Sequence, residues 1–310
     1  MNELEFRVKY VYPCGMFRQA YFPFGYFTGF LDFLRRRADR LQIITYRDLQ
    51  WGGDFDSIGR YPGEQRCWKE QAKRLAKERR ALVLIQHDVD ARPERTLAAL
   101  REERDRKLPS NVMIFRRRVD GHLLKDTGML AFTEYALDHQ FLKELEGERF
   151  VIGYHSNAME QALWDRHVAE HIFLEDLAAL RASFDVDFFS PHGGVIGPGG
   201  TKNRDLEITD ASSLGVRWVH NGRTPRFTAS YSDGGLNGRK LDPATRDLRD
   251  FVRTWEPGGR YRVLLHPQYY TNEPYEPAPR LVGTAWYDDL LQAYSKDPGT
   301  DSWADVEIQW

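Results

Sequence analysis

From residue 82 onward, short apolar runs of strand length alternate with stretches of helical periodicity. This alternation favours βα units around a parallel sheet, because parallel strands need a crossover connection between them. Seven such runs suit an open or incomplete β/α barrel. The predicted strands are Leu82–Gln86, Asn111–Phe115, Phe150–Tyr154, Asp187–Ser190, Val216–Val219, Phe227–Tyr231 and Arg262–Leu265.

Two helices are predicted between these strands, over Pro93–Lys107 and Val168–Ser183. Pro93 stands in the first turn, where a proline costs no hydrogen bond. The preceding segment predicts a helix over Phe27–Ala38, a strand over Leu41–Thr45, a loop over 51–66 and a helix over Trp68–Arg80. We therefore expect an α/β extension over residues 1–80 packed on a barrel over 81–310, together forming one integrated domain.

The ends of the chain are rich in aromatic residues. The first 50 residues hold a cluster of tyrosines and phenylalanines that could line a sugar subsite, although aromatic side chains more often build a core. The segment around Trp286 and Tyr294 has a helix-like pattern. Trp303 and Trp310 follow it and are expected to dock on the body, because exposed tryptophans are costly to leave in water.

Charge and targeting signals exclude some classes of partner. The net charge is −2, which does not favour a nucleic-acid partner. The basic run Arg116–Arg118 is interpreted as a solvated strand end. No window approaches a membrane span, and no signal peptide is recognised, so a cytoplasmic location is expected. The two cysteines, Cys14 and Cys67, form no metal-binding or disulfide pattern.

Five of the nine histidines directly follow strand-like runs. In a parallel β/α architecture the carboxyl ends of all strands meet at one face, which carries the site. We therefore expect these imidazoles to converge, although His87 could instead be buried behind the site. They are His87, His155, His192, His220 and His266. His167 and His171 lie within a predicted helix and are expected at the surface or in packing.

Two carboxylates, Asp88 and Asp90, flank Val89 at the end of the first barrel strand. Residues i and i+2 of an extended segment point to the same side, so two negative charges would meet there. A divalent cation would neutralise them. Imidazole nitrogen with carboxylate oxygen suits a catalytic ion, zinc first, that lowers the pKa of bound water and polarises a carbonyl. The alternative for the pair, a helix cap before Pro93, is less favoured beside the histidines.

Four motifs in this order resemble the polysaccharide deacetylase superfamily. They are His87-Asp88-Val89-Asp90, Gly153-Tyr154-His155-Ser156, Ser190-Pro191-His192-Gly193-Gly194 and Leu264-Leu265-His266-Pro267. The resemblance covers residues 82 to 270. It implies a distorted (β/α)7 barrel and hydrolysis of an N-acetyl or similar amide by a metal-bound water.

The resemblance also implies roles for individual residues. Asp88 would be the general base, Asp90 and His155 metal ligands, and His266 the acid that protonates the departing amine. Backbone N–H groups near His192 and Gly193 would stabilise the oxyanion. His220 and Asn221 could orient a catalytic partner or contact substrate, with packing as an equal alternative.

The sequence departs from the family pattern at two positions. Met159 replaces a usual ligand histidine, so His192, or else Glu160, is expected to supply the third ligand. Phe189 stands where an arginine is usual. The leading interpretation is a metal-dependent hydrolase that removes an acyl group from a sugar or sugar-like small molecule. The alternatives are hydrolysis of another non-peptide C–N bond and an inactive carbohydrate-binding pseudoenzyme.

Overall fold

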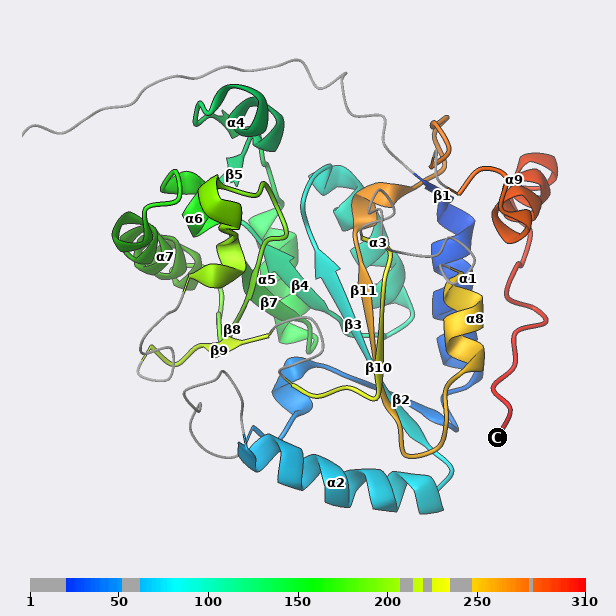
Figure 1. Cartoon of the computed structure of the whole chain (residues 1–310). Helices are drawn as coiled ribbons and strands as arrows, with labels where there is room; N and C mark the ends of the chain where they lie inside the picture. The colour runs from blue at the N-terminus through cyan, green and yellow to red at the C-terminus, as the bar shows by residue number, and fades with distance from the viewer. Residues whose placement is uncertain (1–20, 52–61, 207–213, 220–224, 235–246, 279–280) are drawn as a thin grey trace, which may run out of the picture.

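Seven parallel strands form the centre of the structure, a computed structural model (Figure 1). It describes residues 21–51, 62–206, 214–219, 225–234, 247–278 and 281–310. Each strand lies at one of the seven runs that the sequence predicts. They are β3 (Ala81–Asp88), β4 (Asn111–Ile114), β7 (Val151–Ser156), β8 (Phe188–Pro191), β9 (Arg217–Trp218), β10 (Ala229–Ser232) and β11 (Arg260–Leu265).

The strands pair in the cyclic order of a barrel. From β3 the ladder runs through β4, β7 and β8 to β9, and on the other side of β3 it runs through β11 to β10. The last strand of the set thus pairs with the first. Among the described residues β9 and β10 do not pair, so the barrel is open between them. The predicted α/β class with a distorted (β/α)7 barrel is confirmed.

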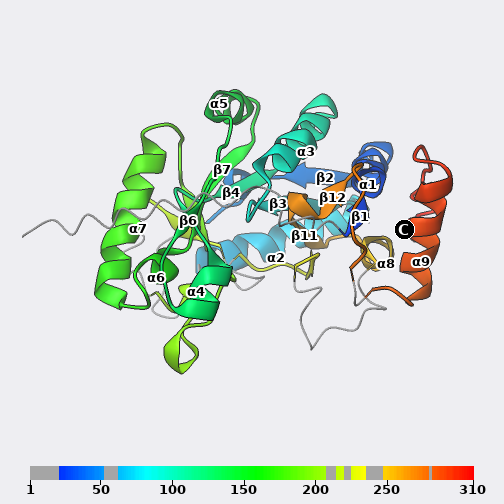
Figure 2. The ribbon, with the colours of Figure 1, turned by 90° about the horizontal axis from the view of Figure 1, so that it is seen from above.

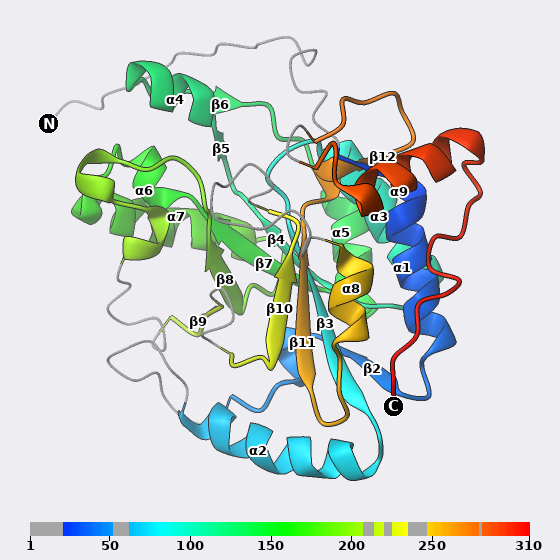
Figure 3. The ribbon, with the colours of Figure 1, turned by 45° about the vertical axis from the view of Figure 1, so that its right-hand side comes forward.

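Helices surround this sheet (Figure 2). In this view α5 (His139–Gly147), α6 (Ala158–Gln161) and α7 (Arg166–Arg181) lie toward one side, and α1 (Phe24–Arg36), α8 (Leu248–Arg253) and α9 (Ala285–Lys296) lie toward the other. Helix α3 (Pro93–Asp105) lies between α5 and α1. Helix α2 (Pro62–Lys77) lies across the lower ends of the strands (Figure 3). The prediction of a loop over 51–66 is wrong at Pro62 to Arg66, where a first-turn proline starts α2.

Strand β3 shows how the barrel sorts its side chains. Successive residues point to opposite faces of a sheet. Leu82 and Leu84 pack in the cluster that fills the barrel interior, whereas Val83 and Ile85 pack outward among the helices. The same alternation sends Asp88 inward and His87 outward.

The N-terminal part lies against β3 and β11. Strand β2 (Leu41–Ile44) pairs with the first half of β3, and β1 (Phe22–Pro23) pairs with β12 (Tyr270–Thr271). The aromatic side chains of α1 are buried in one cluster with both barrel strands. For the aromatic residues buried in this cluster the core interpretation holds, because a fully buried ring cannot stack on a sugar. Tyr10, Tyr12 and Phe17 lie outside the described residues.

The C-terminal tryptophans dock on this cluster, as predicted. Trp303 is fully buried, and its indole nitrogen donates a hydrogen bond to the carbonyl of Tyr26 at 2.8 Å. Trp310 donates to the carbonyl of Trp255 at 2.6 Å. The division of the chain at residue 80 stays a prediction.

The segments between the strands contain further short elements (Figure 1). After β4 the chain forms β5 (Arg118–Val119), α4 (Gly121–Thr127) and β6 (Phe132–Thr133). The 3-10 turns are η2 (Tyr46–Asp48), η3 (Pro198–Gly200), η4 (Asn203–Asp205) and η6 (Pro267–Tyr269). In the described part of the chain, every helix is too short or too polar to cross a bilayer.

Candidate functional site

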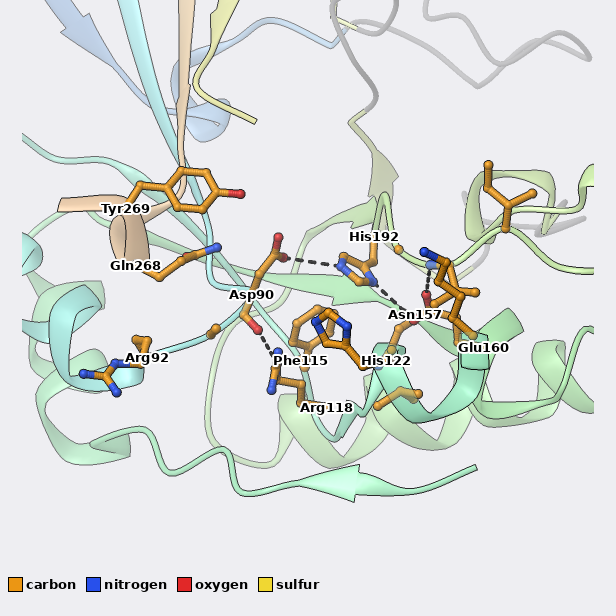
Figure 4. A pocket seen from close by; sticks show the side chains of 17 residues that line it. Asp90, Arg92, Phe115, Arg118, His122, Asn157, Glu160, His192, Gln268 and Tyr269 are labelled. Carbon is orange, nitrogen blue, oxygen red and sulfur yellow. Dashed lines mark hydrogen bonds and ion pairs between the residues drawn. The ribbon is translucent and has the colours of Figure 1, made fainter. Parts of the chain in front are cut away.

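The carboxyl ends of four barrel strands bring three histidines around one carboxylate. Asp90 follows β3, and its Oδ1 lies 3.1 Å from Nε2 of His155 and 3.7 Å from Nε2 of His192. Its other oxygen, Oδ2, lies 3.6 Å from Nε2 of His266. All three imidazoles therefore present the same ring nitrogen to Asp90, and Figure 4 shows His192 facing it.

The second nitrogen of each histidine is held from behind. Nδ1 of His155 lies 3.1 Å from the carbonyl of Ser190, and Nδ1 of His192 lies 3.2 Å from Oε2 of Glu160. Nδ1 of His266 lies 2.5 Å from Oδ1 of Asp233. Such contacts fix both the tautomer and the orientation of an imidazole, leaving Nε2 for a ligand or a proton.

Asp90, His155 and His192 fit a divalent metal ion. Their ligand atoms lie within 4.8 Å of one another. Ligand atoms around a tetrahedral zinc ion, each about 2.0–2.1 Å from it, are roughly 3.3 Å apart. The distances from Asp90 to the two histidines, 3.1 and 3.7 Å, bracket this spacing. Two imidazoles and one carboxylate also leave a coordination position for a substrate or water, as catalytic zinc sites do.

Asp88 lies beside this cluster with one oxygen occupied. Its Oδ1 accepts a hydrogen bond from Nε2 of Gln86 at 2.7 Å, and its Oδ2 lies 3.9 Å from Nε2 of His155. The amide oxygen of Gln86 accepts a hydrogen bond of 2.5 Å from the hydroxyl of Tyr46. Burial raises the pKa of Tyr46 to about 12, so the phenol stays protonated and donates. The chain Tyr46–Gln86–Asp88 thus fixes the carboxylate and leaves Oδ2 facing the site.

The charges in the site oppose the effect of burial. Burial alone would raise the pKa of Asp90, but the charges on His192 and His266 and the hydrogen bond from His155 hold it well below its usual value. Burial would lower the pKa of His266, but Asp233 outweighs it and raises that pKa to about 10. Asp90 is therefore a carboxylate, and His266 carries a proton at neutral pH.

Of the other two strand-end histidines, one lies away from this group and one is outside the described residues. His87 is fully buried on the outer face of β3, and its Nε2 lies 2.8 Å from Oε1 of Glu103 in α3. Of the two positions that the sequence left open for His87, the one buried behind the site is confirmed, because alternation along β3 turns the side chain away from the interior. His220 and its neighbour Asn221 lie outside the described residues. His167 and His171 are exposed on α7, as expected.

The two departures from the family pattern are core residues. Met159 is fully buried in the apolar cluster under α7. Phe189 belongs to the same cluster and stacks on Trp218 with ring centroids 6.2 Å apart. His192, the first choice for a third ligand, reaches Asp90, whereas Glu160, the second choice, lies behind His192.

The expected oxyanion donors are only partly free. The backbone N–H of His192 donates to the carbonyl of Ser156 at 2.8 Å, so it cannot also bind an oxyanion. This part of the prediction is wrong, because the His192 amide closes the end of the β7–β8 ladder. Gly193 is exposed. The next residue, Gly194, has no room for a Cβ, which would overlap the Glu160 carboxylate.

A cavity of about 550 Å³ opens directly from the histidine cluster (Figure 4). The loop after β8, the η6 turn and the β5–α4 insertion form its walls. Arg118 lines it as well, so the interpretation of the basic run as a solvated strand end fails for this residue. The lining residues are Asp90, Ala91, Arg92, Phe115, Arg118, Val119, Gly121, His122, Lys125, Asn157, Glu160, His192, Gly194, Val195, Ile196, Gln268 and Tyr269.

Sequence reasoning missed three residues that organise the site: Asp233, Gln86 and Tyr46. Asp233 stands one residue beyond the end of β10, which is the position that singled out the histidines. Gln86 stands two residues before Asp88, on the same face of β3. The strand-end position of Asp233 and the alternation along β3 at Gln86 could therefore have predicted that both side chains face the site. Tyr46 lies in the N-terminal part, and no local pattern connects it to Gln86.

Comparison with known proteins gives remote likenesses only. No family model and no curated protein matches the sequence. A family 4 carbohydrate esterase from Bacillus anthracis is similar at 14% identity and a TM-score of 0.30, over 73% of this chain and 86% of that one. A family 4 acetyl xylan esterase from Clostridium thermocellum, in complex with a cobalt ion, is similar at 12% identity and a TM-score of 0.33, over 73% and 96%.

A mutant of a CE4-family pseudoenzyme with restored enzymatic activity is similar at 16% identity and a TM-score of 0.32. That likeness covers 68% of this chain and 62% of the other. TM-scores this low do not decide what this chain does.

Proposed function

We propose that the chain is a metal-dependent hydrolase that removes an acyl group, N-acetyl first, from a sugar or sugar-like small molecule. One observation carries the proposal: three imidazoles, each held at Nδ1, present Nε2 to Asp90, and a second carboxylate lies beside them. Asp90, His155 and His192 would hold the metal, with zinc as the first ion to test. A bound divalent ion would supply Lewis acidity, which lowers the pKa of water and polarises a carbonyl.

Asp88 is the base in this proposal. Its Oδ2 faces the cluster while Gln86 holds Oδ1, so the carboxylate has one oxygen ready to accept a proton. It would take a proton from the water whose oxygen attacks the acyl carbon.

His266 is the acid. Asp233 orients its ring and keeps it protonated, with Nε2 directed into the site. As the C–N bond breaks, the amine nitrogen would take this proton and leave as a free amine, and the acyl group would leave as a carboxylic acid. A base beside His155 and an acid beside Asp90 suit the two proton transfers of amide hydrolysis.

Metal content and turnover test the proposal together. We expect the purified protein to hold about one equivalent of divalent metal and to release acetate from N-acetylated amino sugars. Asp90→Ala and His155→Ala should lose the metal, and His171→Ala, an exposed histidine of α7, should keep it. If neither site variant changes the metal content, the metalloenzyme proposal is wrong.

The same experiment separates the alternatives. Metal retained with acetylated sugars bound but not hydrolysed would indicate a carbohydrate-binding pseudoenzyme. Hydrolysis of other amides, but not of acetylated sugars, would indicate that the enzyme cleaves a different non-peptide C–N bond. We favour hydrolysis because Met159, the departure that raised the pseudoenzyme alternative, lies in the core while His192 lies beside Asp90.

A further inference from the structure

The wall of the cavity next to the proposed metal centre carries basic side chains, namely Arg92, Arg118, His122 and Lys125. The acidic lining residues are Asp90 and Glu160. Asp90 faces three imidazoles, and Glu160 accepts from the N–H of Val195 at 2.6 Å and contacts His192. Neither carboxylate forms an ion pair with Arg118 or Lys125.

Two of these side chains, Arg118 and Lys125, are cations available to a ligand. Arg92 already pairs with Glu94 at 2.6 Å and contacts Glu273. Across the described part of the chain, Arg118 and Lys125 form no ion pair with a carboxylate. Arg118 is half-buried, whereas Lys125 is exposed on α4.

Arg118 is held in a fixed position beside the site. Its Nε donates to the backbone carbonyl of Asp90, and its Nη1 donates to Oγ1 of Thr133 at 2.7 Å. Figure 4 shows it directly beside Asp90. A guanidinium anchored through two of its nitrogens has lost much of its freedom before a ligand binds, and its planar fork matches a carboxylate or a phosphate.

Arg118 donates to the backbone of a proposed metal ligand, so it lies at the edge of the centre. An anion bound between Arg118, Lys125 and the centre would be attracted by both side chains, and a partly buried site screens that attraction less than bulk water does. The cavity volume of about 550 Å³ is within the range of small-molecule sites.

We propose that the substrate of this site is an acylated sugar that bears a negatively charged group, a phosphate or a carboxylate, bound by Arg118 and Lys125. The inference rests on the proposed function and names its substrate class. Cations lining the cavity would also steer such a substrate toward it, an effect that salt weakens.

Direct binding tests this inference without requiring turnover. Sugar binding is measured by isothermal titration calorimetry on the zinc-loaded full chain that carries Asp88→Asn. This substitution is used because hydrolysis would add to the measured heat. The probes are N-acetylglucosamine, N-acetylglucosamine 1-phosphate, N-acetylmuramic acid and inorganic phosphate. We expect at least one anionic sugar to bind about tenfold or more tightly than the neutral sugar. The two anionic sugars distinguish a phosphate from a carboxylate.

Charge variants locate the bound anion. Lys125→Glu should lower the affinity for the anionic sugar by about three- to tenfold, and Arg118→Gln should lower it by about ten- to hundredfold. Binding of N-acetylglucosamine should change in neither variant. Lys69→Glu makes the same charge change on an exposed lysine of α2, at the other end of the barrel, and should have no effect. Metal content is measured in each variant, because Arg118 also contacts Asp90.

Two results would overturn the inference. One is that no anionic probe, inorganic phosphate included, binds more tightly than the neutral sugar. The other is that anionic sugars bind more tightly than the neutral sugar but their affinity is the same in both charge variants. That result would indicate that the anion binds to the metal alone. The failure of the proposed function would look different, because it would show as absent metal or absent turnover in the wild-type chain.

Discussion

The side-chain amide of Gln86 donates a 2.7 Å hydrogen bond to Oδ1 of Asp88, and its own oxygen accepts one from Tyr46. All three side chains are buried. A neutral amide therefore holds the carboxylate proposed as the base. The relation depends on β3 alternation, which directs Gln86 and Asp88 to the same interior face.

Removing this support should lower turnover more than substrate affinity. Gln86→Met takes away the donor to a carboxylate at similar volume, and kcat should fall about ten- to hundredfold with metal content unchanged. Tyr46→Phe should give a smaller loss in the same direction. Tyr154→Phe, which removes a buried hydroxyl that donates to Asp176, is the matched control. A change confined to KM, or an equal loss in the control, would show that Gln86 only supports the fold.

Asp88→Asn should keep the metal and lose activity. The variant preserves the shape of the side chain but cannot accept the proton, so kcat should fall by about 10²- to 10⁴-fold. Metal analysis and steady-state hydrolysis of an N-acetylated amino sugar are measured on the same preparation. Turnover within about twofold of the wild type would contradict the role of Asp88 as base.

Glu160→Gln should weaken metal binding by about 10- to 100-fold, because the carboxylate orients His192 from behind. Competition with a chelator measures the affinity. Glu103→Gln alters the same kind of pair, with His87 outside the site, and should leave metal affinity unchanged. Unchanged affinity in Glu160→Gln would argue that His192 is not a ligand.

Asp233→Asn should move the alkaline limb of the pH profile to lower pH. The Asp233 charge raises the pKa of His266 to about 10, and without it burial is the main remaining influence and lowers that pKa. His266 must be protonated to act as an acid, so kcat/KM should decline at a lower pH than in the wild type. Asp176→Asn, a buried aspartate outside the site, is the control. Superimposable profiles would remove the Asp233–His266 pair from the mechanism.

Trp303→Ala should destabilise the fold by about 3–5 kcal/mol, because it empties a buried site among the rings of Tyr26, Phe30 and Phe33. Denaturant unfolding measures the loss. Leu174→Ala on the exposed side of α7 should change stability by less than about 0.5 kcal/mol. Equal stability of the two variants would show that the C-terminal segment does not support the barrel.

Much of the fold could be predicted because the strands are short apolar runs with clear boundaries. The orientation of residues within them was harder to predict. Leu82 to Ile85 is apolar on both faces, since helices cover the outside and the barrel fills the inside, so the run shows no alternation. The face of β3 on which His87 lies could still be inferred from Asp88 and Asp90. If these two face inward, the residue between Gln86 and Asp88 must face outward.

The histidines of the site could be predicted because they lie at strand ends. His155, His192 and His266 each end a strand and meet at Asp90. Asp233 also stands just beyond a strand, but its role follows from its contact with His266, which the sequence does not show. The contact of Tyr46 with Gln86 joins residues 40 positions apart across two elements, and its partners have no shared local pattern.

The hydroxyl of Tyr46 has a consequence for how this protein can change. A chain shortened to residues 81–310 would keep every proposed ligand and both proposed proton carriers, yet it would lack the residue that anchors Gln86. A change at either of these two residues therefore affects the support of Asp88. Among homologues, we expect positions 46 and 86 to covary, and a graft of this barrel onto another N-terminal segment to need both residues together.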